Sequence, residues 1–160
     1  MRISTRCSTA IHALLMIAIF SPRRKITSSF LSKSIGGHPV EIRKVLGNLK
    51  KAGIIDVSRG SGGAVLNVKP EDITFLDIYS AVDTAALQEL IGLHPNPSSI
   101  CPVGKNIHKL LSYPCEEIAQ AVKQTMESIN LEQLLNNLYE IEPSVKELAD
   151  TMPEISLGDL

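Results

Sequence analysis

The sequence contains no tryptophan, and aromatic residues make up only 4% of its 160 residues. A core built from such a chain must be mainly aliphatic, and a chain of this length can bury one domain's core. Cysteine is also scarce. The chain has three cysteines, an odd number, and they lack paired spacing. This usage argues against a disulfide framework. The composition therefore predicts one domain, or one domain with an appendage, in a cytoplasmic protein.

The chain also lacks an apolar run long enough to span a bilayer. The run Ile11–Phe20 covers ten residues, whereas a membrane-spanning helix needs about 20. The basic residues before this run resemble a secretory signal, but no small-x-small cleavage site follows and His12 interrupts the run. We therefore expect a buried helix over about residues 4–20 and no membrane partner.

Acidic residues are nearly absent from the first 70 positions. This part carries 12 Lys and Arg against 2 Asp and Glu, whereas residues 71–160 carry 4 against 15. Such a split predicts a basic half that meets a polyanion and an acidic half that does not. Attraction between the two halves is the alternative explanation.

Two short helices with a glycine turn between them are predicted in the basic half. Thr27 is placed to cap a helix over residues 28–35, which Gly36 and Gly37 end. The second helix is predicted over residues 39–52, with a histidine as its N-cap, a proline at its first position and a glycine just after its end. This arrangement is typical of a helix-turn-helix.

The second helix has two distinct faces. The i, i+3, i+4, i+7 rule predicts a buried stripe of Ile42, Val45, Leu46 and Leu49. The opposite face, expected to be basic and free of carboxylates, carries Val40, Arg43, Lys44, Gly47 and Lys51. We predict that these five residues contact DNA.

The glycine-rich stretch SRGSGGA lies between two short β-rich runs, residues 54–58 and 64–68. A phosphate-binding loop would need a helix directly after the glycines, and no Gly-Lys-Ser/Thr is present. The pattern instead predicts a β-hairpin wing. Arg59 and Ser61 near its tip are predicted to enter a minor groove or bind a phosphate. An ordinary hairpin with a solvated arginine is the alternative.

The run from Val45 to Asp83, with LKKAGIIDVSRGSGG followed by DITFLDIYSAVD, resembles the Rrf2 family of bacterial winged-helix transcription regulators. The resemblance covers roughly residues 1–138. It implies a homodimer, two recognition helices in successive major grooves, and Arg59 in the minor groove. The base-reading positions of the family fall on Val40, Arg43 and Lys44, and an arginine there could bind guanine O6 and N7.

Family members that bind an iron–sulfur cluster carry three closely spaced cysteines after the wing, whereas this chain has only Cys101 in that segment. The alternative is an unusual set of cluster ligands, drawn from Cys101, Cys115, His94, His108 and His12. The phrase HPNPSSICPVGKNI instead resembles the single-cysteine, YwnA-like branch, for which no cluster is expected. We therefore predict no metal and no cofactor. The same residues have plainer interpretations, His12 as a core histidine and His94 and His108 as loop and surface residues.

Cys101 precedes a predicted helix over residues 103–112. A helix N-terminus lowers the pKa of a thiol, and Lys105 would add to that effect. Cys101 is thus a candidate redox or electrophile sensor, with Cys115 as a candidate resolving partner. A small buried side chain that only packs is the alternative.

After Pro114, residues 115–128 have an apolar stripe at helical spacing, made of Ile118, Val122, Met126 and Ile129. We expect this helix to pack on its mate in a dimer. Asn130 then caps a further short helix. The acidic residues 140–160 are expected to be a loosely docked or partly disordered tail.

The predicted fold class is mostly α with a small β-hairpin wing. A winged helix-turn-helix is expected over residues 1–83, a linker and helical dimerisation region over 84–139, and the tail over 140–160. The predicted function is a dimeric, sequence-specific DNA-binding regulator, acting as a repressor on double-stranded DNA and without catalytic residues. The alternatives are a thiol-based redox enzyme or relay using Cys101, and a protein-interaction module on a degenerate winged helix. Binding to random duplex DNA that weakens steeply with salt would favour the regulator.

Overall fold

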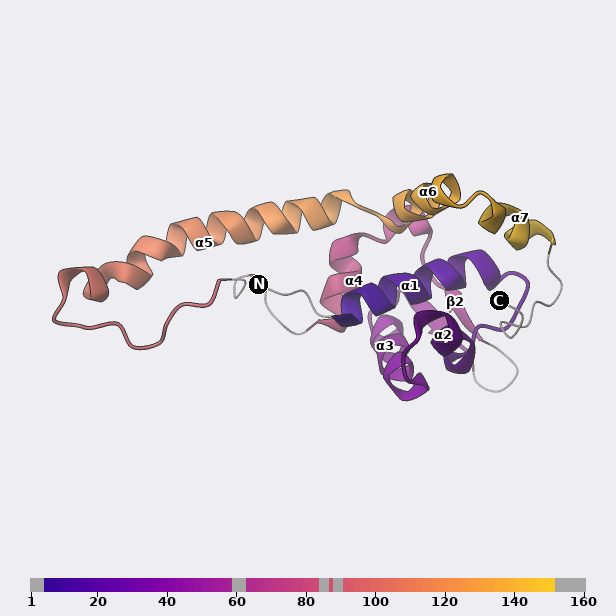
Figure 1. The fold of residues 1–160 in the computed structure, drawn as a ribbon, viewed down its shortest axis with the longest axis horizontal. Coiled ribbons are helices and arrows are strands. Elements are labelled where there is room, and N and C mark those ends of the chain that lie inside the picture. Colours follow the sequence, from indigo (N-terminus) through magenta and orange to yellow (C-terminus); the bar gives the residue numbers. More distant parts are fainter. Residues whose placement is uncertain (1–4, 59–62, 84–86, 88–90, 152–160) are drawn as a thin grey trace.

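The computed structural model describes residues 5–58, 63–83, 87 and 91–151 (Figure 1). Helix α1 (Thr5–Phe20) runs through the middle of the folded body. It contacts α2 (Ser28–Ile35), α3 (Pro39–Lys51), β2 (Ala64–Leu66), α4 (Phe75–Val82) and α6 (Leu131–Ile141). Because it is surrounded, seven of its 16 residues are buried, namely Cys7, Ala10, Ala13, Leu14, Met16, Ile17 and Ile19. The prediction of a buried first helix is confirmed over its described residues.

Helices α2 (Ser28–Ile35) and α3 (Pro39–Lys51) form the predicted pair. The Thr27 hydroxyl accepts the Phe30 N–H and so caps α2. Gly36 ends that helix in the left-handed conformation, at φ 73°, which a glycine adopts without strain. The two helices pack against each other and against α1. The helix-turn-helix is therefore present, and its second helix ends one residue earlier than predicted.

Strands β1 (Ile55–Val57) and β2 (Ala64–Leu66) pair antiparallel, with Ile55 opposite Leu66. They are one to two residues shorter at their ends than the sequence pattern predicted. Ala64 N–H donates to the carbonyl of Ile26, at 2.9 Å, which ties the hairpin to the segment before α2. The wing is thus anchored at its base to the helix-turn-helix.

After β2, a short 3₁₀ helix η1 (Pro70–Asp72) leads into α4 (Phe75–Val82). The start of α4 lies beside the start of α6 (Leu131–Ile141), because Thr74 and Asn130 form an isolated β-bridge. Each of these two residues caps its own helix through a reciprocal capping box. The cap predicted at Asn130 is confirmed, and the bridge holds the starts of α4 and α6 together.

Helix α5 is continuous over Pro102–Ser128 and passes through Pro114. The sequence pattern predicts a boundary at this proline, with separate helices over residues 103–112 and 115–128, and that prediction is wrong. A proline inside a helix removes one backbone hydrogen bond and crowds the preceding turn. Because Pro114 is exposed, the freed carbonyl can be solvated, and the helix continues.

The two halves of α5 have different surroundings. The C-terminal half packs against α4, and Met126 is buried in the main core with Val122 packed on it. The N-terminal half extends away from the body (Figure 1). Part of the stripe that we expected to cover a partner is therefore covered by the chain itself, since Met126 is 6% exposed.

The C-terminal region is more ordered than the sequence suggested. Helix α6 runs to Ile141, and a further helix, α7 (Ser144–Thr151), packs against it. The predicted loose tail over residues 140–160 is thus helical in its first part, and its last residues lie outside the described ranges. The fold class, mostly α with a two-stranded hairpin wing, is confirmed.

Candidate nucleic-acid interface

Helix α3 presents its predicted face to solvent. On the opposite side of the helix, the buried stripe packs into the core; its residues are Ile42, Val45, Leu46 and Leu49. The side chain of His38 caps the helix, with Nδ1 accepting the Val40 N–H at 3.2 Å. The five predicted contact residues are all exposed, namely Val40, Arg43, Lys44, Gly47 and Lys51. The structure therefore brings them together on one open surface, which we call the α3 face.

The expectation that this face carries no carboxylate is wrong. Glu41 lies at its edge, and its Oε1 is 2.7 Å from Lys44 Nζ. The hydrogen bond and charge of Lys44, followed by weaker contributions from Arg6 and His38, hold the pKa of the Glu41 carboxyl below its usual value. The described residues provide no ion-pair partner for Arg43 or Lys51. Arg43 and Lys51 are thus available to bind an anion, whereas Lys44 is paired with Glu41.

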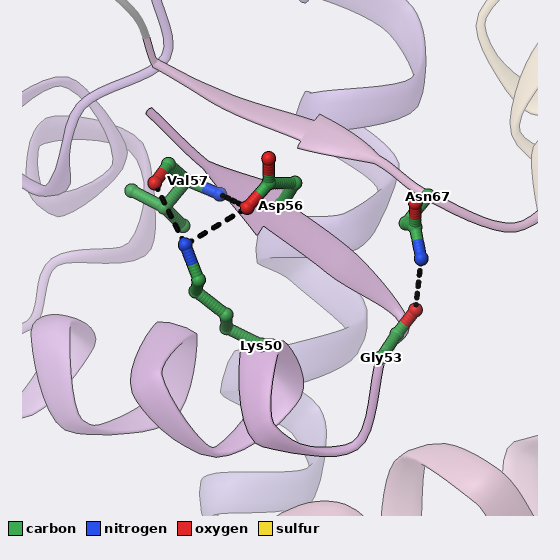
Figure 2. Close-up of polar contacts among 5 residues, drawn as sticks. All are labelled: Lys50, Gly53, Asp56, Val57 and Asn67. Carbon is green, nitrogen blue, oxygen red and sulfur yellow. Dashed lines mark hydrogen bonds and ion pairs between the residues drawn. The ribbon is translucent and has the colours of Figure 1, made fainter. Parts of the chain in front are cut away.

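A set of polar contacts that sequence reasoning missed joins α3 to the wing (Figure 2). Lys50 Nζ donates to the Val57 carbonyl at 2.9 Å and lies 2.8 Å from Asp56 Oδ1. Asn67 Nδ2 donates to the Gly53 carbonyl at 3.0 Å. The sequence pattern does not predict these contacts of Lys50, because helical periodicity identifies the faces of a helix and not its partners beyond the helix end. The signal that could have identified the ion pair is the presence of opposite charges, Lys50 and Asp56, on either side of the turn at Gly53.

The wing itself is described only up to its base. Ser58 N–H donates to the Gly63 carbonyl at 3.3 Å and closes the hairpin. A Cβ at Gly63 would stand 2.6 Å from the backbone nitrogen of Ile26, so only glycine fits this close approach. Arg59 and Ser61, the predicted wing contacts, lie outside the described residues.

The candidate sensor thiol is far from the α3 face. Cys101 is the N-cap of α5, is exposed, and lies at the outer end of that helix (Figure 1). Hydrogen bonds from the backbone N–H groups of Gly104 and then Val103 lower the pKa of the Cys101 thiol. The expected contribution of Lys105 is not among these causes.

The proposed pairing of Cys101 with Cys115 within one chain is incompatible with α5. The two residues are separated by fourteen positions of a continuous helix, which corresponds to about 21 Å of rise. A disulfide requires Cα atoms within about 7 Å. Cys115 instead lines a groove between α4 and α5 that also includes Tyr79, Asp83 and Lys123.

The histidines have the plainer of their two interpretations. His12 is partly buried, its Nε2 lies 3.0 Å from Ser34 Oγ, and burial lowers its pKa. His108 Nε2 lies 2.9 Å from the carbonyl oxygen of His94. In each of these two rings, one nitrogen thus has a polar contact within the described chain.

Comparison with known proteins addresses the family. A family model described as "Iron-dependent Transcriptional regulator", Rrf2, matches residues 3–137. The chain belongs to the Rrf2 family. It is 34% identical over 137 residues to a Bacillus subtilis (strain 168) protein that carries the name HTH-type transcriptional regulator YwnA, covering 86% of this chain and 99% of YwnA.

Solved structures of the family share the fold. CymR, the global cysteine regulator of B. subtilis, superposes with a TM-score of 0.62 at 20% identity, covering 85% of this chain and 97% of CymR. IscR of T. potens gives a TM-score of 0.63 at 20% identity, with 89% and 91% covered. The Rrf2 chain described here is thus a DNA-binding, HTH-type transcriptional regulator and not an enzyme. No helix in its described part is both long and apolar enough to cross a membrane.

The iron in the family description does not fit the donors of this chain. Within the described ranges, no three His, Cys, Asp or Glu residues gather in a way that could hold a metal ion. Cys7 lies in the core at 1% exposure, and Cys101 and Cys115 are separated along α5. Cluster ligation needs several thiolates that converge on one site. We therefore derive no step of this regulator's action through iron.

Proposed function

We propose that this Rrf2 regulator acts as a homodimeric, sequence-specific repressor. Each protomer would place α3 in a major groove, with the α3 face against the base edges and phosphates. Arg59 and Ser61 of the wing would contact the adjacent minor groove or its phosphates. The observation that carries this proposal is the exposed α3 face, whose Arg43 and Lys51 have no ion-pair partner in the described chain.

Gly47 supports this assignment. A glycine in the interior of a helix costs about 1 kcal/mol relative to alanine. A Cβ at Gly47 would meet nothing within 4 Å, so no neighbour in the described chain requires the missing side chain. Close approach of DNA to α3 is a reason outside the chain. Gly47→Ala is therefore expected to stabilise the free protein slightly and to weaken operator binding.

The dimer proposal now rests on the N-terminal half of α5. Val103, Leu110 and Tyr113 are 67%, 67% and 68% exposed, although all three are large and apolar or aromatic. Such a face is typical of a protein contact. We propose that two copies of α5 pack along this face, with Ile118 at its inner end. Sedimentation that shows a monomer at micromolar concentration would contradict the dimer.

Selection of bound duplexes from a random pool tests the DNA-binding proposal. The expected operator is a pseudo-palindrome whose half-sites lie about one helical turn apart, or a multiple of it. Arg43→Ala should relax the preference at particular base pairs, whereas Lys51→Ala should weaken binding evenly and reduce the salt slope by about one. If neither substitution changes affinity, α3 is not the recognition helix. Binding that is insensitive to salt would instead favour a protein-interaction module.

A second proposal, favoured by the lowered pKa of exposed Cys101, is that this thiol senses oxidants or electrophiles. The thiolate would attack a peroxide oxygen, the O–O bond would break, hydroxide or alkoxide would leave, and a sulfenic acid would remain. Because Cys101 lies at the end of the exposed α5 face, added polarity there would disturb the dimer contact rather than the wing.

Operator binding measured before and after peroxide tests this second proposal. Wild type should lose affinity and dimer stability together, whereas Cys101→Ser should keep both. Cys115→Ser serves as the matched control and should respond like wild type. Equal responses from wild type and Cys101→Ser would leave Cys101 without a sensory role.

A further inference from the structure

The first 70 residues contain only two carboxylates, and each is close to a lysine of α3. Asp56 lies 2.8 Å from Lys50, at the junction with the wing. Glu41 lies 2.7 Å from Lys44, on the exposed side of the helix. The first pair has a clear structural context, since Lys50 also donates to Val57. The second pair joins two residues of the same exposed helix and ties α3 to nothing else.

The position of Glu41 within α3 is informative. It is the third residue of the helix, after Pro39 and Val40, and its side chain is 57% exposed. In helix-turn-helix proteins the N-terminal residues of the recognition helix contact the base edges. Glu41 is therefore close enough to the leading end of α3 to meet the floor of a major groove when Arg43 and Lys44 do so.

A carboxylate at this place is unfavourable unless it meets a donor. The groove is bordered by phosphates, and a carboxylate only accepts hydrogen bonds. Of the base edges in the major groove, the cytosine N4 amine is the donor that Glu and Asp use, while Lys pairs with guanine O6 and N7. Glu41 and Lys44 together thus present the acceptor and donor that a C·G pair, or two adjacent pairs, would match.

We propose that Glu41 is a specificity-determining residue, which accepts a hydrogen bond from a cytosine N4 amine while Lys44 donates to a guanine. This inference rests on the proposed placement of α3 in the major groove. On sequences without cytosine at this position, Glu41 finds no base donor and keeps its ion pair with Lys44, so the guanine contact of Lys44 is lost and affinity is lower. Away from the operator, it holds Lys44 and so reduces sequence-independent binding.

The test uses the full chain and two variants with the same chemical change. Glu41→Gln removes the charge on α3 and keeps the shape. Glu71→Gln is the matched control, because Glu71 is also an exposed glutamate beside a lysine, 3.3 Å from Lys69, but belongs to η1, which packs against α6. Affinities are measured for the selected operator, for every single-base-pair change in one half-site, and for a random duplex over a range of salt.

Glu41→Gln should reduce the preference for cytosine at one position of each half-site by about fivefold or more, the low end expected of one base contact. It should also bind the random duplex more tightly, with a salt slope steeper by about one. Glu71→Gln should behave like wild type. Thermal unfolding of both variants close to that of wild type would confirm that folding is unaffected.

Two results would overturn the inference. Glu41→Gln could keep every base preference, whether or not it gains random-duplex affinity, or it could lose preference for a base other than cytosine. Failure of the proposed function is a different result, in which wild type itself shows no salt-dependent binding to duplex DNA.

Discussion

The folded body and the outer half of α5 use apolar residues in opposite ways. In the body, α1 to α4 bury their stripes against one another, and Leu14, Leu31 and Leu49 are each 0% exposed. In the outer half of α5, Leu110 is 67% exposed. The body therefore buries its apolar residues within one chain, whereas the outer helix leaves its own exposed, where we propose that a second copy packs. Substitutions of similar size should have different effects in the two regions.

The largest difference is expected between two leucines. Leu49→Ala leaves a cavity in the body and should lower the free energy of unfolding by about 2–5 kcal/mol. Leu110→Ala removes a side chain that the same chain leaves exposed, so monomer stability should change by less than about 0.5 kcal/mol. Urea unfolding at low protein concentration measures both values. Equal losses would mean that the outer half of α5 packs within its own chain.

The cysteines should show the next largest difference. Burial, with a smaller contribution from the Asp83 charge, raises the pKa of the Cys7 thiol to about 11, whereas the pKa of the Cys101 thiol is lowered below its usual value. Since one pKa unit changes the thiolate fraction about tenfold near neutral pH, Cys101 should react with iodoacetamide at least about 100-fold faster than Cys7. Mass spectrometry of the native protein measures the two rates. A Cys7 that reacts as fast as Cys101 would place it outside the core.

The same shift gives a pH dependence with a definite sign. The folded state holds Cys7 protonated to a pH of about 11, while the unfolded thiol ionises near 9.0. The stability that this creates is complete below the unfolded pKa and is lost as pH rises through the folded pKa. Wild type should thus lose more stability between pH 9 and 11 than Cys7→Ala.

Two tightly packed glycines provide a third contrast. A Cβ at Gly63 would stand 2.6 Å from the Ile26 nitrogen, and one at Gly104 would stand 2.5 Å from the Ser98 carbonyl oxygen. Gly63→Ala should cost about 1–3 kcal/mol of unfolding free energy, because the body must shift to accept it. Gly104→Ala should leave global unfolding nearly unchanged but move the pKa of Cys101 toward its usual value. Urea unfolding and pH-dependent labelling distinguish these outcomes.

The smallest effect is expected for two lysines of equal exposure. Lys50 and Lys123 are 49% and 48% exposed, and each has one carboxylate partner. Lys50→Gln and Lys123→Gln should each change stability by no more than about 1 kcal/mol, since exposed ion pairs contribute little. Only Lys50→Gln should alter operator affinity, because Lys50 joins α3 to the wing. If Lys123→Gln alters it equally, the effect is one of net charge.

Local signals in the sequence were sufficient for most of the body. The caps at Thr27 and His38 and the left-handed glycine at position 36 lie where turn chemistry predicted them. The buried stripe of α3 follows from its helical period alone, although α1, α2, α4 and β1 all pack against this helix. Side-chain partners across elements were missed, as for Lys50, because periodicity contains no information about which strand follows the turn.

The second half was predicted less well for a related reason. Pro114 predicts a helix end, because proline removes one backbone hydrogen bond. In an exposed helix, water can solvate the carbonyl that loses its partner, and the helix continues. The sequence pattern predicts that the stripe with Val122 and Met126 packs against a partner. These residues instead pack against α4 and the core of their own chain, which is formed largely by residues distant in sequence. Periodicity identified an apolar face correctly but could not tell an intramolecular neighbour from an intermolecular one.

Pro114 also divides α5 as a cooperative unit. Helix propagation depends on successive i→i−4 hydrogen bonds, and position 114 cannot donate one. Fraying that begins at the outer end should therefore stop near this residue instead of spreading toward Met126. In amide hydrogen exchange of the monomer, protection should rise within about one turn after Pro114. We therefore expect the outer helix to open and close while the body remains folded.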